Sequence, residues 1–167
     1  VLLLGLFAVQ HTIMAREPFK EKITKLIPPA AERSTFVLVT NLVLILLYWQ
    51  WRPMPNIVWD VSGTPALAYA IWSICILGWI TVLYSTFLIN HFDLFGLRQV
   101  YLFFTGKEYT HAPFVQPWLY RQVRNPLMLG FLLAFWAAPT MSQGHLLFAA
   151  VVTGYILFGV TIEERDL

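Results

Sequence analysis

Long stretches without a charged residue are the feature that most restricts what this chain can fold into. No Asp, Glu, Lys or Arg occurs between Val61 and Phe92, or between Asn125 and Ile162. Apolar residues make up 58% of the sequence and charged residues 12%, whereas soluble domains are about 25% charged. Uncharged apolar stretches are typical of helices that cross a bilayer, which need roughly 20 residues. The sequence therefore predicts an integral membrane protein in contact with the lipid bilayer.

We expect an all-α, polytopic fold with five transmembrane helices. The expected spans are 1–15, 36–51, 66–92, 127–141 and 145–162. The second and fourth spans are short, so snorkelling flanks or local thinning of the bilayer would have to compensate. A four-span alternative, in which the last two stretches form one re-entrant hairpin, stays open. The chain starts inside an apolar run, which suggests a truncated first span, and we expect residues 1–167 to form a single membrane domain.

The distribution of basic residues predicts the orientation of these spans. Of the 11 Lys and Arg residues, all except Arg52 lie in the first loop (16–35), the third loop (93–126) or the C-terminal tail. The positive-inside rule then places both loops and the C-terminus in the cytoplasm. Five crossings put the N-terminus outside.

The charge pattern and the single cysteine argue against several classes of partner. The net charge is +2, and no basic run alternates with aromatic residues, so we expect no nucleic-acid partner. Cys75 is the only cysteine, which rules out a disulfide within the chain, and no Cys/His zinc spacing occurs. We therefore expect no metal, and we interpret Cys75 as a packing residue rather than a nucleophile.

The motif Arg124-Asn125-Pro126 begins the fourth expected span, and Gly130 follows one turn later. Pro126 suits the first turn of a helix, where unpaired N–H groups carry positive potential that favours a carboxylate. Arg124 would add a bidentate clamp on that carboxylate. Gly130 would let a ligand or another helix approach the backbone closely. The third loop before this motif is long enough to be functional, and 94–104 has the spacing of an interfacial amphipathic helix; a solvated loop is the plain alternative.

Two adjacent carboxylates, Glu163 and Glu164, follow the fifth expected span. Carboxylates at a membrane boundary are costly, and here they would hold an ammonium group or ribose hydroxyls; an ordinary solvated helix end is the alternative. Because the last two spans form a hairpin, the anion site and the cation site should lie together. Such a pair matches the zwitterionic amino-acid end of S-adenosyl-L-methionine.

Residues 120–167 resemble the C-terminal part of the isoprenylcysteine carboxyl methyltransferase and phospholipid methyltransferase superfamily. Its signature is Arg-His-Pro, a glycine four residues later, a helical hairpin and a Glu-Glu pair, and the chain departs from it only in having Asn125 in place of the histidine. An amide cannot titrate near neutral pH, so cofactor binding could survive this change but a proton-transfer role could not. The resemblance implies a cofactor-binding part at about 91–167. The implied cofactor-binding residues are Tyr120, Arg121, Arg124, Asn125, Pro126, Gly130, Glu163 and Glu164.

More narrowly, the whole chain resembles the bacterial methanethiol S-methyltransferases. The segments that carry this resemblance are 11–16, 90–99 and 135–141. It implies methyl transfer from S-adenosyl-L-methionine to methanethiol, giving dimethyl sulfide, at the cytoplasmic face of the bacterial inner membrane. The thiol must react as a thiolate. We expect His91 to act as the base, or as an orienting group together with Asp93, with His11 and Arg16 as further catalytic candidates.

Two alternatives stay open. A second enzymatic interpretation keeps the cofactor site but methylates a prenylated cysteine carboxylate or a phospholipid amine. A different class is a non-catalytic membrane subunit, for example one that binds haem through His11 and His91. Pocket size separates the two enzymatic interpretations, because methanethiol needs a small closed cavity whereas a lipid chain needs a groove.

Overall fold

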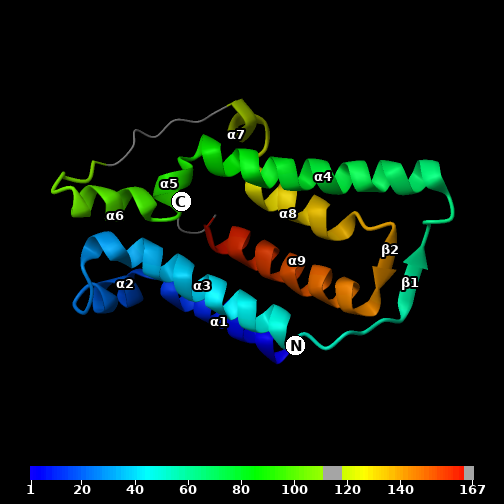
Figure 1. Ribbon diagram of the computed structural model, residues 1–167, viewed down its shortest axis with the longest axis horizontal. Helices are drawn as coiled ribbons and strands as arrows, with labels where there is room; N and C mark the ends of the chain where they lie inside the picture. The colour runs from blue at the N-terminus through cyan, green and yellow to red at the C-terminus, as the bar shows by residue number, and fades with distance from the viewer. Residues whose placement is uncertain (111–117, 164–167) are drawn as a thin grey trace. The chain divides into compact units, whose positions relative to one another are not determined.

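A computed structural model describes residues 1–110 and 118–163 of the chain (Figure 1). Its contacts divide the chain into two compact units, each built from two separate segments. Unit 1 comprises Val1–Trp51 and the segment that begins at Ile89. Unit 2 comprises Arg52–Leu88 and the segment that begins at Gln116. The expectation of a single domain for 1–167 stays a prediction.

The regular secondary structure of unit 1, within its described residues, consists of helices. Its elements are α1 (Leu2–Met14), α2 (Glu17–Ile23), the 3-10 helix η1 (Pro29–Ala31), α3 (Glu32–Trp49), α5 (His91–Leu94) and α6 (Leu97–Phe104). Proline occupies the first turn of both α2 and η1, where its missing N–H costs nothing. The amphipathic helix expected at 94–104 is present as α6, with its start at Leu97.

The packing of unit 1 joins the start of α3 to the turn between α5 and α6. Arg33 Nε donates a hydrogen bond of 2.8 Å to the carbonyl oxygen of Leu94. Gly96 has a φ of +75° and packs against the backbone at Ser34 so closely that a Cβ would collide with it. Glycine is required at this position for both reasons. The turn that carries His91 is thus held against α3.

Unit 2 combines three apolar helices with a short sheet. Its elements are β1 (Ile57–Asp60), α4 (Pro65–Leu88), α7 (Trp118–Gln122), α8 (Pro126–Trp136), β2 (Thr140–Ser142) and α9 (Gln143–Glu163). Helix α8 runs antiparallel to both α4 and α9 (Figure 1). The start of α8 and the ends of α4 and α9 therefore lie toward the same end of the unit.

Small residues let α4 and α8 pack with their backbones nearly touching. A Cβ added at Gly78 would lie 2.6 Å from the backbone nitrogen of Ala134 and 2.8 Å from the carbonyl oxygen of Gly130. A Cβ at Gly130 would lie 2.8 Å from the carbonyl oxygen of Gly78 and 2.9 Å from the backbone nitrogen of Val82. Close approach through small residues is the usual basis of helix association in membranes.

The sheet is the part of the fold that the sequence did not predict. Strands β1 and β2 pair antiparallel, with Trp59 opposite Met141 and Asp60 opposite Thr140. The indole Nε1 of Trp59 donates a 2.9 Å hydrogen bond to the carbonyl oxygen of Ala138. The chain is mostly helical, in agreement with the expected all-α class, but in this region α8 ends at Trp136 and a strand replaces the expected end of the fourth span.

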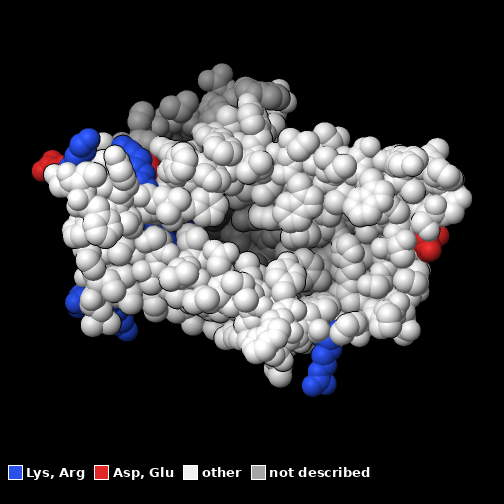
Figure 2. Space-filling model, viewed as in Figure 1, with Lys and Arg blue, Asp and Glu red and all other residues white. Residues whose placement is uncertain are grey.

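Within residues 1–110 and 118–163, three helices are long and apolar enough to cross a membrane. They are Pro29–Trp49, Pro65–Leu88 and Gln143–Thr161, and α1 and α8 are shorter apolar helices. Large apolar side chains on α4, such as Ile80 and Leu83, are more than half exposed, and the surface of α4 between its ends carries no charge (Figure 2). Such a surface suits lipid. The chain is a mostly helical integral membrane protein, as expected, while the number of five spans stays a prediction.

Candidate active site

The first turn of α8 is built around Asn125, the residue that stands in place of the superfamily histidine. Its Oδ1 accepts a hydrogen bond of 3.2 Å from the backbone N–H of Met128, and its carbonyl oxygen accepts one of 3.1 Å from Leu129. Pro126 follows as the first helical residue and is buried. Asn125 is thus an N-cap. The Asn125 side chain therefore accepts from one of the N–H groups that the sequence predicted would bind a ligand carboxylate. Fewer backbone N–H groups remain at this helix terminus to bind an anion.

Arg124 and Tyr120 lie next to this helix start. Helix α7 ends at Gln122, and Arg124 is exposed in the short connection between α7 and α8. Tyr120 lies on α7 and is partly buried. Burial raises the pKa of the Tyr120 phenol, and the nearby Ser85 hydroxyl opposes part of that rise. The phenol is therefore neutral near pH 7 and can donate a hydrogen bond.

Gly130 is occupied by helix packing. The close approach that the sequence predicted there is made by Gly78 and Val82 of α4. A ligand therefore does not meet the backbone of α8 at the face that Gly130 presents to α4.

The carboxylates expected at the end of α9 lie largely outside the described residues. Glu163 is the last residue of α9, but its side chain, Glu164 and the side chain of Arg121 are not part of the described structure. The antiparallel course of α8 and α9 directs Glu163 toward the same end of unit 2 as Arg124 (Figure 1). The predicted juxtaposition of an anion site and a cation site stays a prediction.

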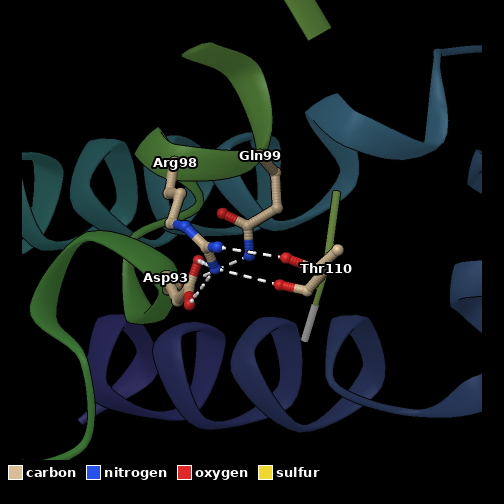
Figure 3. Close-up of polar contacts among 4 residues, drawn as sticks. All are labelled: Asp93, Arg98, Gln99 and Thr110. Atoms are coloured by element: carbon tan, nitrogen blue, oxygen red, sulfur yellow. Dashed lines mark hydrogen bonds and ion pairs between the residues drawn. The ribbon is translucent and has the colours of Figure 1, made fainter. Parts of the chain in front are cut away.

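Asp93 forms an ion pair in unit 1 that the sequence did not predict (Figure 3). Arg98 Nη1 lies 2.9 Å from Oδ2 and 3.3 Å from Oδ1 of Asp93, and it also donates to the carbonyl oxygen of Thr110 at 3.1 Å. Gln99 Nε2 donates to the Asp93 carbonyl oxygen at 3.2 Å. The Arg98 guanidinium also lies over the Tyr109 ring, 5.4 Å from its centroid. Asp93 thus fixes the α5–α6 turn and the segment that follows α6.

The remaining catalytic candidates of unit 1 lie on three different elements. His91 is the first residue of α5, and the centroid of its ring lies 4.8 Å from the centroid of the Phe95 ring. His11 lies on α1, with its ring 4.9 Å from that of Phe36. Arg16 precedes α2 as its N-cap residue. All four candidates for the thiol chemistry are therefore in unit 1, whereas the cofactor candidates of the helix hairpin are in unit 2.

Two residues of these clusters were not predicted from the sequence as site residues. Arg98 forms an ion pair with Asp93, and the Ser85 hydroxyl lowers the pKa of Tyr120. The spacing of Asp93 and Arg98 could have suggested an ion pair in a turn between short helices. Ser85 lies in an uncharged apolar span, where no sequence signal separates it from other small helix-packing residues.

Comparison with known proteins decides the family. The chain is 59% identical over 167 residues to "Methanethiol S-methyltransferase" of Mycobacterium tuberculosis (strain ATCC 25618 / H37Rv), which covers 100% of this chain and 68% of that protein. This chain belongs to the methanethiol S-methyltransferase family. The resemblance seen in the sequence is thereby confirmed. "Methanethiol S-methyltransferase 1" of Bradyrhizobium diazoefficiens is 53% identical over 167 residues, covering 100% of this chain and 58% of that protein.

A more distant similarity extends beyond the methanethiol S-methyltransferases. Nurim of Xenopus laevis is 30% identical over 172 residues, covering 98% of this chain and 60% of that protein. The chain thus spans between 58% and 68% of the length of these relatives. No family model and no solved structure matches the chain. The match to the methanethiol S-methyltransferases includes the N-terminal segment with His11 and Arg16 as well as the C-terminal hairpin.

Proposed function

We propose that this chain catalyses the S-adenosyl-L-methionine-dependent methylation of methanethiol to dimethyl sulfide. The observation that carries the proposal is the 59% identity over the whole chain to a methanethiol S-methyltransferase. The bound methyl donor would supply an electrophilic methyl group on a sulfonium. The protein must align the thiol sulfur with that methyl group, which is mainly a positioning task.

The residues at the end of unit 2 fit a zwitterionic methyl donor. Arg124 is an exposed cation beside the first turn of α8, where the positive end of the helix dipole also favours a carboxylate. Glu163 and Glu164 would hold the ammonium group or the ribose hydroxyls. The neutral Tyr120 phenol adds a hydrogen-bond donor beside Arg124. Arg121, Asn125, Pro126 and Gly130 complete the proposed cofactor-binding set, the last three by building and packing the start of α8.

The thiol proton requires an acceptor, and His91 is our candidate. An imidazole is suited to accept a proton from a thiol at neutral pH. In this proposal Asp93 acts through the α5–α6 turn, because its carboxylate is engaged by Arg98 at 2.9 Å. His11 and Arg16 are proposed to act on the thiol beside His91.

The membrane location suits a small apolar substrate. Methanethiol can reach the protein through lipid, whereas the charged methyl donor arrives from the cytoplasm. We propose that the chain lies in the bacterial inner membrane with the N-terminus outside, the C-terminus inside and five helices across the bilayer. No bound metal is needed for a displacement at a sulfonium methyl group.

The direct test uses purified protein, methyl-labelled S-adenosyl-L-methionine and methanethiol, with labelled dimethyl sulfide measured in the headspace. The Asn125→His variant is run in parallel, because the superfamily has histidine there. Label in dimethyl sulfide from either form supports the proposal. If label appears only in an added prenylcysteine or phosphatidylethanolamine, that compound and not methanethiol is the substrate. No transfer and no S-adenosylhomocysteine binding in either form would reject the proposal.

The cofactor site has its own test in Arg124→Ala, with Arg52→Ala as the control. Both arginines are in unit 2, but Arg52 lies in the loop before β1. Hydrogen bonds to charged groups contribute about 1.5–3 kcal/mol, so Arg124→Ala should weaken S-adenosylhomocysteine binding about 10- to 100-fold. Titration calorimetry should show unchanged binding for Arg52→Ala. Equal affinities for Arg124→Ala and the unmodified protein would remove Arg124 from the site.

A further inference from the structure

The guanidinium of Arg33, near the start of α3, is held in place by two contacts within unit 1. Its Nε donates the 2.8 Å hydrogen bond to the carbonyl oxygen of Leu94. Its Cζ lies 5.2 Å from the centroid of the Phe36 ring, which is a cation–π distance. The backbone of Arg33 is fixed as well, because a Cβ added at Gly96 would lie 2.9 Å from the Arg33 carbonyl carbon. The guanidinium therefore has a defined position.

The same two contacts connect Arg33 with both histidines of the proposed thiol chemistry. The Phe36 ring that contacts the guanidinium also packs on the His11 ring, with 4.9 Å between the two centroids. Leu94, whose carbonyl oxygen accepts from Arg33, is the last residue of α5, the helix that begins at His91. Arg33 thus lies between α1 and the turn that carries His91. The sequence did not predict this, because the three elements are far apart along the chain.

No carboxylate forms an ion pair with Arg33 within residues 1–110 and 118–163. Asp93 of α5 is engaged by Arg98 at 2.9 Å. The two Nη groups of Arg33 donate no hydrogen bond in the same ranges, and neither is a buried polar atom without a partner. They therefore face space that a ligand can enter. The histidines and charged residues on the helices around Arg33 are His11, Glu32, His91, Asp93 and Arg98.

A small anion is the ligand that this guanidinium lacks. Arg33 lies within the apolar helix Pro29–Trp49, and a charge in such a segment is costly and is usually functional. Methanethiol has to react as a thiolate. A neighbouring arginine favours the thiolate over the thiol. The chemistry that the reaction requires and the charge that Arg33 presents therefore match.

We propose that Arg33 is a catalytic residue whose Nη groups bind the sulfur of methanethiol and stabilise it as the thiolate. This inference rests on the proposed function, because it names the group that binds the substrate of that reaction. The thiol gives its proton to His91, and the thiolate sulfur forms the new bond to the methyl carbon. The electron pair of the broken bond stays on the sulfur of S-adenosylhomocysteine. Arg33 keeps its charge throughout, since a guanidinium does not deprotonate in proteins.

The pH dependence of turnover by Arg33→Gln tests this role. Because an adjacent cation lowers the pKa of an acid, the pH at which kcat/KM for methanethiol is half-maximal should rise by about 1–2 pH units in the variant. Each tenfold loss of thiolate is partly offset by an about threefold gain in nucleophilicity, so kcat/KM at pH 7 should fall about three- to tenfold. This loss should disappear at a pH where the bound thiol is ionised in both forms. Arg33→Lys keeps the charge and should retain most of the activity at pH 7.

A second readout does not depend on turnover. With S-adenosylhomocysteine bound in place of the methyl donor, methanethiol added to the unmodified protein at neutral pH should produce the ultraviolet difference absorbance of a thiolate. Arg33→Gln should show much less of it. Lys22→Gln is the matched control, because it removes a cation from an exposed position on α2 in the same unit. It should leave the absorbance and the pH dependence unchanged.

The outcomes separate this inference from the proposed function. A loss in Arg33→Gln that is equal at every pH would show that Arg33 only supports the turn at Leu94, and it would overturn the inference even if dimethyl sulfide is formed. A thiolate signal that is lost in Arg33→Gln, without dimethyl sulfide from any form, would support the anion site and reject the proposed function. Should Arg33→Gln fail to fold, the unmodified protein provides the test. Thiocyanate, a small anion, should then compete with methanethiol at constant ionic strength, and absence of competition would overturn the inference.

Discussion

At the start of α8, Asn125 satisfies the Met128 N–H with its own side chain. In the sequence, Asn125 precedes Pro126 and is a reasonable N-cap. The comparison with the superfamily histidine predicted only that this residue cannot exchange a proton near neutral pH. A histidine at this position would have to provide the acceptor through a ring nitrogen. The residue therefore has a role in folding that is separate from its role in the proposed cofactor site.

We predict that Asn125→Ala lowers the free energy of unfolding by about 1 kcal/mol, the usual effect of losing an N-cap side chain. Asn125→Asp keeps the acceptor oxygen and adds a negative charge at the positive end of the helix, so it should retain the stability. Thermal unfolding in one detergent, followed by circular dichroism, measures the difference. Equal unfolding temperatures for Asn125→Ala and the unmodified protein would show that the cap does not stabilise α8.

Among the elements, α4 and α8 pack closely because Gly78 and Gly130 have no side chain at their contact. Gly78 and Gly130 bring two backbones into contact, and Trp79 of α4 places its ring 5.7 Å from that of Phe135 in an edge-on arrangement. In lipid, association of helices depends on such packing because no hydrophobic effect drives it.

Gly130→Ala should therefore destabilise the protein by about 1–3 kcal/mol, the range for overpacking a well-packed contact. Its Cβ would lie 2.8 to 2.9 Å from backbone atoms, which cannot rotate away. Gly154→Ala is the matched control, because a Cβ there meets nothing within 4 Å and alanine is the better helix former. Detergent unfolding curves should rank Gly154→Ala at or above the unmodified protein. A Gly130→Ala variant of equal rank would contradict the observed packing.

The β1–β2 sheet depends on Asp60, and its stability should depend on pH. Asp60 Oδ1 accepts hydrogen bonds from Ser62 N–H at 2.9 Å and from the Thr140 hydroxyl at 3.0 Å. The Ser62 hydrogen bonds, followed by the one from Thr140, lower the pKa of the Asp60 carboxyl. A carboxyl with a lowered folded-state pKa stabilises the fold above its ordinary pKa of about 3.9, and the contribution is lost as pH falls through the folded value.

We therefore expect the unfolding temperature to fall more steeply below about pH 4 in the unmodified protein than in Asp60→Ala. The two curves should converge at low pH, where the carboxyl is protonated. Thermal unfolding between pH 3 and pH 6 measures the difference. Parallel curves over that range would show that Asp60 does not hold the sheet.

For the whole molecule, the candidate catalytic residues and the candidate cofactor-binding residues belong to different units. The thiol candidates, including His91, belong to unit 1, and Tyr120 and Arg124 belong to unit 2. Each unit is internally well defined by contacts such as the Asp93–Arg98 pair. The proposed reaction requires both sets at one membrane face, which the distribution of basic residues predicts.

Labelling of introduced cysteines in a Cys75→Ser background tests that orientation. Lys22→Cys and Lys107→Cys probe the first and third loops, and Ser62→Cys probes the loop after β1. A membrane-impermeant maleimide added to whole cells should label only Ser62→Cys, because the positive-inside rule places the other two in the cytoplasm. All three should be labelled in opened membranes. Labelling of Lys22→Cys or Lys107→Cys from outside would reverse the proposed topology.

The sequence by itself determined the apolar helices, the membrane class, the family and the start of α8 at Pro126. These follow from local properties, since the length of an uncharged stretch and the residues around a proline are read along the chain. Only the tertiary structure decided that Asp60 pairs with Thr140, that Gly130 meets Gly78 and that Asp93 binds Arg98. Apolar helices without a strong polar face can rotate without changing their pattern, so side chains far apart in sequence meet only where packing decides.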